Sequence, residues 1–351
     1  MKIEDKLADF KNKIDPLIKK YLEDKIEKYQ KIFPESILLI DQVKDLTLRG
    51  GDRIRPALFY YGFKLIKDPN TLEKKELLRL STAFETFHSF ALIHDDIIDN
   101  GILRRGKKTV NKYFDDYFGS NLGDRLAILS GDMAEIFCQE IFQSRMFGNN
   151  FAQALAIFIQ MKEETIIGEY MDTVYPLLKK FPDVHKIKKV LCFKSAYYSV
   201  QKPLVIGALL AGANESQTKM LSLIGEDLGL AFQIRDDILG IFGKQELTGK
   251  SVLSDIIEGK RTLLIMQTLQ RLAKKKDKIR LQKLLGKKDI LSKDVLWIKK
   301  TIKDSGALNY CQKECGRLVT DAKSKLEKNQ FDQEAKTFLI ELSDFIIQRK
   351  Y

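Results

Sequence analysis

The stretch LLRLSTAFETFHSFALIHDDIID, residues 77–99, decides the fold class. Its apolar residues recur at alternating steps of three and four, which places them on one helix face: Leu77, Leu80, Phe84, Phe87 and Ala91. Similar spacing covers residues 1–33, 151–171, 186–212, 219–242 and 262–285, whereas strand-like alternation is short and scattered. We therefore expect an all-α fold, built as one large helical bundle domain over residues 1–351 that can hold a deep cavity between helices.

The composition agrees with a large helical protein and indicates its cellular compartment. The chain has 351 residues, of which 44% are hydrophobic and only 7 are prolines, so it can bury a large core. Its four cysteines form no CxxC pair, and no apolar run reaches roughly 18 residues, the length needed to span a membrane. The charged N-terminus lacks the apolar segment of a signal peptide. We expect a cytoplasmic protein without a transmembrane segment.

The net charge of +12 is concentrated in the C-terminal part of the chain. Residues 271–351 hold 21 Lys and Arg against 11 Asp and Glu. A solvated basic helix face explains this excess most simply. Attraction to a polyanionic substrate and weak association with an anionic membrane surface are the alternatives. We do not expect a nucleic-acid partner, because the acidic clusters described next would serve no purpose in binding one.

Acidic residues end the helix predicted at residues 77–99. Asp95 and Asp99 are one turn apart on one face, and His88 continues that face toward the N-terminus. Crowded carboxylates repel one another, so we expect a counter-charge. Mg²⁺ is suitable because it takes one or two carboxylates and fills its other positions with water and phosphate oxygens. Arg104 and Arg105 follow, and their planar guanidinium groups bind phosphate well. The pattern predicts a site for a magnesium diphosphate.

A second acidic cluster, Gln233-Ile234-Arg235-Asp236-Asp237, lies within the helix predicted at 219–242. Cations follow it too, at Lys250, Lys260 and Arg261. Solvated surface aspartates would explain either cluster alone. Two clusters with the same order of acids and bases favour a site, in which the two helices face each other across a bundle and hold several Mg²⁺ ions around one diphosphate.

Taken together, the motifs of the chain resemble the trans-isoprenyl diphosphate synthases, the polyprenyl synthetase family, and most closely its archaeal-type geranylgeranyl diphosphate synthases. The resemblance runs from about Gly50 to about Leu264. The motifs that carry it are GGDRIRP (50–56), DDIID (95–99), RRG (104–106), GD (131–132), GEYMD (168–172), KSA (194–196), FQIRDD (232–237) and the segment between GK (249–250) and GK (259–260).

Membership of this family implies the isoprenoid synthase type of helical bundle around a deep central cavity, and it implies a trans-prenyltransferase. Such an enzyme ionises an allylic diphosphate (dimethylallyl, geranyl or farnesyl). The carbocation is attacked by the double bond of isopentenyl diphosphate, and a proton is lost. Three Mg²⁺ ions and nearby cations stabilise the leaving diphosphate. The resemblance also implies a homodimer.

The resemblance assigns roles residue by residue. The metal ligands would be Asp95, Asp99 and Asp236, supported by Asp96 and Asp237. The allylic diphosphate would be bound by Arg104, Lys194, Ser195, Gln233, Lys250 and Lys260. Isopentenyl diphosphate would be bound by Arg55, His88 and Arg105. The catalytic set is therefore Asp95, Asp96, Asp99, Arg104, Lys194, Asp236 and Asp237.

Several positions depart from the family pattern. Asp52 replaces the lysine that binds isopentenyl diphosphate, and a carboxylate there would repel a diphosphate. Either the affinity is weaker or Arg53 compensates by binding the substrate. Glu169 replaces a glutamine, and Gly240 replaces the last aspartate of the second motif. Asp52 leaves open a second function, a non-catalytic regulatory subunit of a heteromeric prenyltransferase.

The length of the product is expected to depend on the helix before Asp95. By resemblance, residues N-terminal to Asp95 lie deeper in an apolar tunnel, so Phe90 is roughly 7–8 Å deeper at about 1.5 Å per residue. Phe90 with the small Ala91 beside it, and Phe87 a turn further on, resembles the family members that make geranylgeranyl diphosphate. We expect this C20 product. Farnesyl diphosphate or a longer product is the alternative, and core packing would equally explain the two aromatic residues.

Two further classes of protein fit the residues less well. A terpene cyclase on the same fold takes one prenyl substrate, which leaves Arg55, His88 and Arg105 without a ligand. A nucleic-acid-binding helical protein is suggested only by the basic charge.

Overall fold

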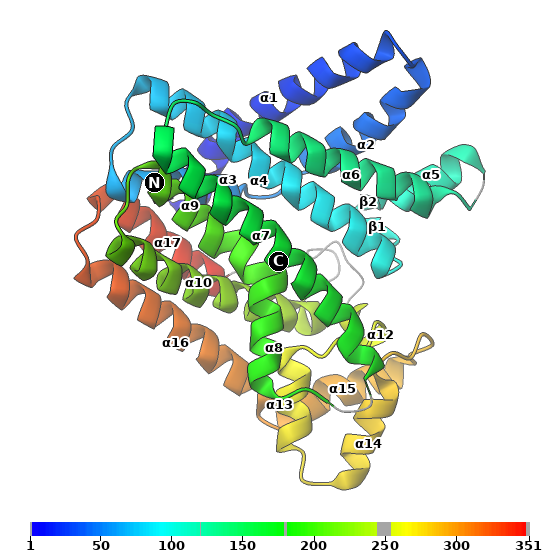
Figure 1. The fold of residues 1–351 in the computed structure, drawn as a ribbon. Coiled ribbons are helices and arrows are strands. Elements are labelled where there is room, and N and C mark those ends of the chain that lie inside the picture. Colours follow the sequence, from blue (N-terminus) through cyan, green and yellow to red (C-terminus); the bar gives the residue numbers. More distant parts are fainter. Residues whose placement is uncertain (1, 120, 179–180, 244–253, 349–351) are drawn as a thin grey trace. The chain divides into compact units, whose positions relative to one another are not determined.

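The computed structural model describes residues 2–119, 121–178, 181–243 and 254–348, and it confirms the all-α fold (Figure 1). The chain divides into two compact units. Unit 1 contains Met1–Ile157 and Pro203–Asn214, and unit 2 contains Phe158–Lys202 and Glu215–Tyr351. The single domain expected for residues 1–351 stays a prediction.

Unit 1 is built from helices and one short hairpin. Its elements are α1 (Ile3–Gln30), the 3-10 turn η1 (Pro34–Ser36), α2 (Ile37–Leu48), α3 (Ile54–Ile66), α4 (Thr71–Ile98), β1 (Leu103–Arg104), β2 (Lys107–Lys108), α5 (Val110–Phe118), α6 (Gly123–Ile141), the first part of α7 (Gly148–Val174) and nearly all of α9 (Lys202–Leu210). Helix α4 is central, because α1, α2, α3, α5 and α6 all pack against it.

Helix α4 begins with a strong cap and ends at the acidic cluster. Asn70 accepts hydrogen bonds from the backbone of Leu72 and Glu73, and the Glu73 side chain accepts in return from the backbone of Asn70, which forms a capping box. Most of the helix is buried from Leu77 onward, so its position is fixed by packing as well as by the cap. The helix ends at Ile98 with Asp99 as its C-cap, which places the first aspartate motif in its last turn.

The chain turns back on α4 immediately after that motif. Leu103 pairs with Lys108 and Arg104 with Lys107 in a two-stranded antiparallel hairpin. Its turn residues, Arg105 and Gly106, both have positive φ (53° and 74°), as a tight hairpin of this hand requires. The hairpin therefore returns Arg104 to the end of α4.

Unit 2 is entirely helical in the part that the structure describes. Its elements are the second part of α7, the 3-10 turn η2 (Tyr175–Leu177), α8 (Val184–Leu191), the π-helix η3 (Cys192–Gln201), α10 (Glu215–Phe242), α12 (Ser254–Ile257), α13 (Leu263–Arg271), α14 (Lys275–Leu284), α15 (Ser292–Asp304), α16 (Ala307–Lys328) and α17 (Gln333–Gln348). Helix α10 is central here, and η3, α13, α16 and α17 pack against it.

The structure differs from the sequence expectations at two places in unit 2. The helix expected over 186–212 changes its winding, since residues 192–201 form a π-helix, a form that is common near functional sites. The helix expected over 262–285 is interrupted at 272–274. Leu272 and Lys274 are both extended (ψ 121° and 119°), so α13 ends at Arg271 and α14 begins as a separate helix at Lys275.

The search for candidate membrane spans agrees with the absence of an apolar run in the sequence. Among the described residues, no helix is long and apolar enough to cross a membrane.

Candidate active site

Arg104 offsets part of the negative charge at the acidic end of α4. The Arg104 Nη2 donates to Asp95 Oδ2 at 2.8 Å, and its Nε donates to Asp96 Oδ1 at 3.0 Å. Burial alone would lower the pKa of Arg104, but the carboxylates of Asp96 and Asp95 outweigh it and raise that pKa. The three side chains therefore form a charged, largely buried group, with Asp99 one turn further along α4. Arg104 thus supplies a counter-charge to the aspartates of α4, whereas its binding of phosphate stays a prediction.

Arg105 points away from those carboxylates, toward the loop before α3. Its Nη1 donates to the carbonyl oxygen of Gly50 at 3.0 Å. A β-carbon on Gly51 would lie 3.2 Å from Arg105 Nη2, so the loop backbone is in contact with the guanidinium. Burial lowers the pKa of Arg105; Glu85 opposes this shift, and the positive charges of Arg53, Arg55 and Arg104 add to it. Such an excess of positive charge is relieved by an anion.

His88 and Glu85 lie on α4 within the same arginine group. Burial, together with Arg55, Arg105 and the two other arginines, lowers the pKa of His88 well below its ordinary value, so the imidazole is neutral near pH 7. Burial would raise the pKa of Glu85, but Arg53, Arg55 and Arg105 outweigh it and lower that pKa. The group therefore holds one ionised carboxylate and a neutral imidazole among several cations.

The loop residues Asp52 and Arg53 have opposite environments. Asp52 is exposed. The Arg53 side chain has no exposed surface, and its guanidinium donates to Asp15, Glu85 and backbone carbonyl oxygens. This placement does not support the expectation that Arg53 binds substrate, because its hydrogen bonds are directed into the protein interior.

In unit 2, Lys194 lies between two carboxylates of α7. Its Nζ is 3.0 Å from Glu169 Oε1 and 2.7 Å from Asp172 Oδ2. A β-carbon on Gly168 would collide with the backbone of Lys194, so only glycine allows α7 and the π-helix to approach this closely. Ser195 follows Lys194 and is partly exposed. The GEYMD and KSA motifs are therefore in contact.

The second aspartate motif forms a carboxylate cluster on α10. Asp237 is buried; its Oδ1 accepts from Gln233 Nε2 at 3.0 Å, and its Oδ2 is buried with no hydrogen-bond partner. Burial and the carboxylates of Asp255, Asp236 and Asp172 raise the pKa of Asp237 well above its ordinary value. A bound cation would stabilise the ionised form of such a cluster.

Two residues that follow α10 in the chain, Asp255 and Lys260, lie beside the carboxylates of unit 2. A β-carbon on Gly240 would lie 3.0 Å from Asp255 Oδ2, so Asp255 fills the space beside the position where the motif lacks its last aspartate. Lys260 Nζ is 2.8 Å from Glu258 Oε2 and 3.9 Å from Asp172 Oδ2. Lys250 lies outside the described residues.

The carboxylates fit Mg²⁺ better than they fit an ion held by protein alone. Within the described ranges, no group of three or more His, Cys, Asp or Glu side chains is arranged to hold a metal ion. Mg²⁺ needs only one or two carboxylates when phosphate and water supply its other ligands. The buried Asp237 oxygen without a partner and the crowded aspartates around it agree with that donor set.

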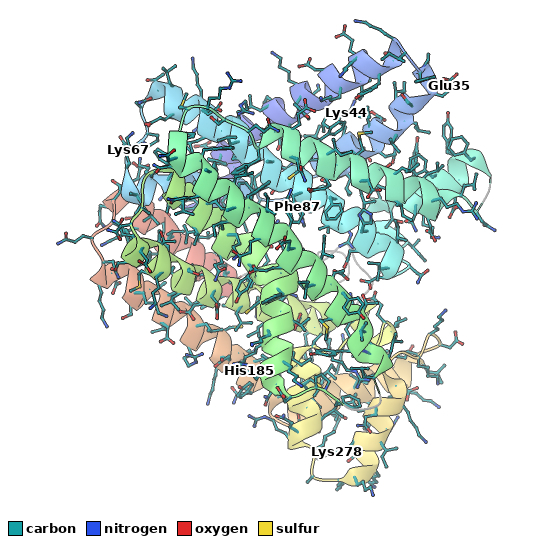
Figure 2. The ribbon with its side chains drawn as sticks, viewed as in Figure 1. Glu35, Lys44, Lys67, Phe87, His185 and Lys278 are labelled. Atoms are coloured by element: carbon teal, nitrogen blue, oxygen red, sulfur yellow. The ribbon has the colours of Figure 1, made fainter. Side chains whose placement is uncertain are left out.

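The proposed chain-length residues occupy two sides of α4. The rings of Phe87 and Phe90 are 5.4 Å apart, and Phe90 is 4.7 Å from the ring of His94. Phe87 is buried in the interior of unit 1 (Figure 2), whereas Phe90 and Ala91 are partly exposed. At about 100° per residue, Ala91 shares the face of Asp95, and Phe90 is turned roughly 140° from it. Ala91 is thus the residue in line with Asp95.

Sequence reasoning gave no role to several residues that the structure places in these groups. Glu85 and Asp15 are buried or half-buried partners of Arg53, and Asp172 is a partner of Lys194. Glu85 has a local signal, because it is a charged residue on the apolar face three positions before His88. Asp15 has none, because it lies 38 residues from Arg53 on an ordinary amphipathic helix.

Comparison with known proteins shows the family of this chain. A family model described as polyprenyl synthetase matches residues 38–302. A short chain isoprenyl diphosphate synthase of Methanocaldococcus jannaschii is 32% identical over 97% of this chain and 94% of its own length. A geranylfarnesyl diphosphate synthase of Aeropyrum pernix is 32% identical over 87% of this chain and 92% of its own. A crystal structure of geranylgeranyl pyrophosphate synthase from Corynebacterium glutamicum, complexed with isoprenyl diphosphate and magnesium, has a TM-score of 0.91 at 27% identity and covers 98% of this chain and 99% of that one.

The fold and its charged groups are thus those of a trans-prenyltransferase, and this chain belongs to the polyprenyl synthetase family. Its activity is that of a short-chain isoprenyl diphosphate synthase. The two relatives with named products differ in chain length, so they leave the product of this chain unassigned.

Proposed function

We propose that this enzyme condenses isopentenyl diphosphate with allylic diphosphates and releases geranylgeranyl diphosphate, the C20 product. The observation that carries the proposal is the division of charge in unit 1. Arg104 pairs with the aspartates of α4, while Arg105 belongs to a separate arginine group with excess positive charge. One group suits a metal-bound diphosphate and the other suits a diphosphate bound directly by guanidinium groups.

In this proposal the allylic diphosphate is bound by Arg104, Lys194, Ser195, Gln233, Lys250 and Lys260. Isopentenyl diphosphate is bound by Arg55, Arg105 and the neutral His88. Asp95, Asp99 and Asp236 hold Mg²⁺, three ions per site by family resemblance, with Asp96 and Asp237 in support. When bound, the metal supplies positive charge for the leaving diphosphate. The residues orient both substrates and stabilise developing charge, and none of them acts as a nucleophile.

The expected product length follows from the surroundings of Ala91 and Phe90. Ala91 shares the face of Asp95, so a large side chain there would block a growing chain. Phe90 is braced by Phe87 and His94, which gives a fixed aromatic wall. We expect Ala91→Phe to shorten the main product by at least one isoprene unit and Phe90→Ala to lengthen it by at least one. Chromatographic sizing of the dephosphorylated products measures both changes.

The deciding experiment is turnover of purified protein with labelled isopentenyl diphosphate and, separately, dimethylallyl, geranyl and farnesyl diphosphate. EDTA and Asp95→Ala should each abolish incorporation. A C20 product supports the whole proposal, and another length keeps the enzyme but contradicts the chain-length assignment. Folded protein that elongates no primer would favour the regulatory-subunit alternative.

We also propose a homodimer, supported by the exposed face of α6. Ile128, Leu129 and Ile136 are 42%, 54% and 57% exposed, an unusual density of large apolar side chains on a solvated helix. Light scattering should give twice the chain mass for wild type and the single mass for the Leu129→Asp/Ile136→Asp variant. Gln282→Asp, at an exposed position of α14 rather than on this face of α6, is the control. A wild-type protein with the mass of one chain contradicts the proposal.

A weak association of unit 2 with anionic membrane surfaces is proposed from its basic helices. On α15, Lys293, Leu296, Lys300 and Lys303 recur on one exposed face, and on α14 Lys278 lies at the outer edge of the unit (Figure 2). Exposed leucine among lysines is suited to a lipid headgroup region. Sedimentation with phosphatidylglycerol vesicles, but not with phosphatidylcholine vesicles, should recover the protein at low salt. Equal recovery with both lipids, or none, contradicts this association.

A further inference from the structure

Arg53 is the centre of a buried ion cluster. Its Nε donates to Asp15 Oδ1 at 2.6 Å, its Nη1 donates to Glu85 Oε2 at 2.8 Å, and its Nη2 donates to the carbonyl oxygen of Thr47 at 2.8 Å. These partners lie on α1, α4 and the last turn of α2. One side chain, with no exposed surface, therefore ties three helices of unit 1 together.

The same guanidinium also fixes the loop that Arg105 contacts. Arg53 Nη1 donates to the carbonyl oxygen of Gly50 at 3.0 Å, and Arg105 Nη1 donates to that same oxygen at 3.0 Å. The next residue, Gly51, has its backbone against the Arg105 guanidinium. A shift of the Gly50 carbonyl would therefore move Arg105.

The backbone around this shared carbonyl is held in unusual conformations. Gly50, Gly51, Arg53 and Arg105 all have positive φ, at 117°, 98°, 54° and 53°. For the two arginines this left-handed conformation is unfavourable, and it persists only where the surroundings fix it. The hydrogen bonds of Arg53 to the carbonyl oxygens of Thr47 and Gly50, and to Asp15 and Glu85, supply that constraint on the loop.

Glu85 links the cluster to the arginines assigned to isopentenyl diphosphate. Its carboxylate is buried on α4 and is close enough to Arg53, Arg55 and Arg105 for all three to act on it electrostatically. Unpaired guanidinium groups this close would repel one another and spread apart. A buried carboxylate tied to Arg53 keeps the other two in a defined array.

We propose that Arg53 is a positioning residue, which together with Asp15 and Glu85 holds the Gly50 carbonyl and so orients Arg105 and Arg55 for the diphosphate of isopentenyl diphosphate. This inference rests on the proposed function. It also gives Arg53 a role that does not require contact with substrate. Loss of the cluster should therefore weaken the binding of isopentenyl diphosphate but not the binding of the allylic substrate.

The test compares the KM values of the two substrates in Arg53→Lys and Asp15→Asn. Lysine keeps the charge but cannot reach three partners in fork geometry. We expect Arg53→Lys to raise KM for isopentenyl diphosphate about tenfold and Asp15→Asn about threefold, with KM for the allylic substrate changed less than twofold. A merely structural loss would lower the active fraction, and with it kcat, without separating the two KM values.

Arg79→Lys is the matched control. Arg79 lies on α4, the helix that carries Glu85, and like Arg53 it makes four hydrogen bonds, to Glu76 and to the backbone of Ile141 and Gln143. It should lower Tm without changing the ratio of the KM values. If Arg53→Lys does not fold, Asp15→Asn carries the test, because Asp15 is half-buried and asparagine preserves its shape.

Calorimetric titration of isopentenyl diphosphate into wild type and variants separates the possible failures. Wild type that neither elongates a primer nor binds isopentenyl diphosphate contradicts both the proposed function and this inference. A second outcome is an active wild type and an Arg53→Lys variant in which both KM values rise equally or neither rises. This outcome overturns the positioning role of Arg53 but leaves the proposed function intact. Selective loss of affinity for isopentenyl diphosphate supports it.

Discussion

Replacing Asp52 by lysine should strengthen the binding of isopentenyl diphosphate. Asp52 is exposed and follows Gly51, whose backbone is in contact with the Arg105 guanidinium. A diphosphate bound by Arg105 would therefore lie close to the Asp52 carboxylate and be repelled by it. The Asp52→Lys variant reverses the charge without changing any hydrogen bond of the buried Arg53 cluster.

The size of the effect follows from Coulomb's law. One residue step of about 3.8 Å plus a side chain gives a charge separation of roughly 7 Å. At the dielectric constant of water, each pair of unit charges then contributes about 0.6 kcal/mol. A change of two charges acting on a diphosphate of about −2 gives about 2.4 kcal/mol, and screening at physiological ionic strength reduces it to about 1 kcal/mol. That is about a fivefold lower KM for isopentenyl diphosphate.

Steady-state kinetics with each substrate varied in turn measure this difference. KM for the allylic diphosphate should change less than twofold, and the gain should largely disappear near 0.5 M salt, where the Debye length is about 4 Å. Asp24→Lys, on the exposed surface of α1, adds the same charge at a remote position and is the control. An equal fall of KM in both variants, or a rise in Asp52→Lys, would refute the reasoning.

Two further predictions concern stability. Gly131→Ala places a methyl group against the imidazole ring of His94 on α4 and should lower the free energy of unfolding by about 1–3 kcal/mol, measured by urea titration. Gly316→Ala is the control, because its methyl group meets open space, and it should be neutral or stabilising in the same titrations. Hydrogen bonds from Arg317 and Lys188 lower the pKa of Glu314 to about 2. Because the folded-state pKa is depressed, this stabilisation is complete above the ordinary value of 4.5 and is lost as pH falls toward 2. The advantage of wild type over Glu314→Gln should thus fall from about 1 kcal/mol near neutral pH to near zero near pH 2. A Gly131 variant as stable as wild type, or a Glu314 difference that does not vary with pH, would contradict these expectations.

The helical periodicity of the sequence was sufficient to predict the fold class and to place both aspartate motifs on helices. Residues 77–99 carry a repeating apolar face and a carboxylate end, and both features are local. The hairpin at 103–108 is not predicted by that reasoning, because strands of two residues contain no periodicity. The π-helix at 192–201 also escaped it, since its apolar residues keep a helical spacing while the winding changes.

The role of Arg53 shows why local motifs mislead. Within GGDRIRP it is one of two arginines in an apparent phosphate-binding loop, and nothing nearby distinguishes it from Arg55. Its partners Asp15 and Glu85 are 38 and 32 residues away. Only the packing of α1 and α4 around the loop turns one arginine inward. Of the two alternatives for Asp52, this packing favours a weaker affinity over compensation by Arg53.

The adjacent arginines 104 and 105 follow from the same geometry and are not interchangeable. Arg104 lies in a strand position that faces the carboxylates of α4, and Arg105 occupies the left-handed turn position that faces the Gly50 carbonyl. Because a hairpin turn sends neighbouring side chains to different sides, one short motif supplies a cation to each charged group. In Arg104→Lys the lysine cannot bridge Asp95 and Asp96 in fork geometry. We expect this variant to bind the metal-bound allylic diphosphate more weakly. In Arg105→Lys those aspartates stay paired with Arg104. This variant should lose affinity for isopentenyl diphosphate alone.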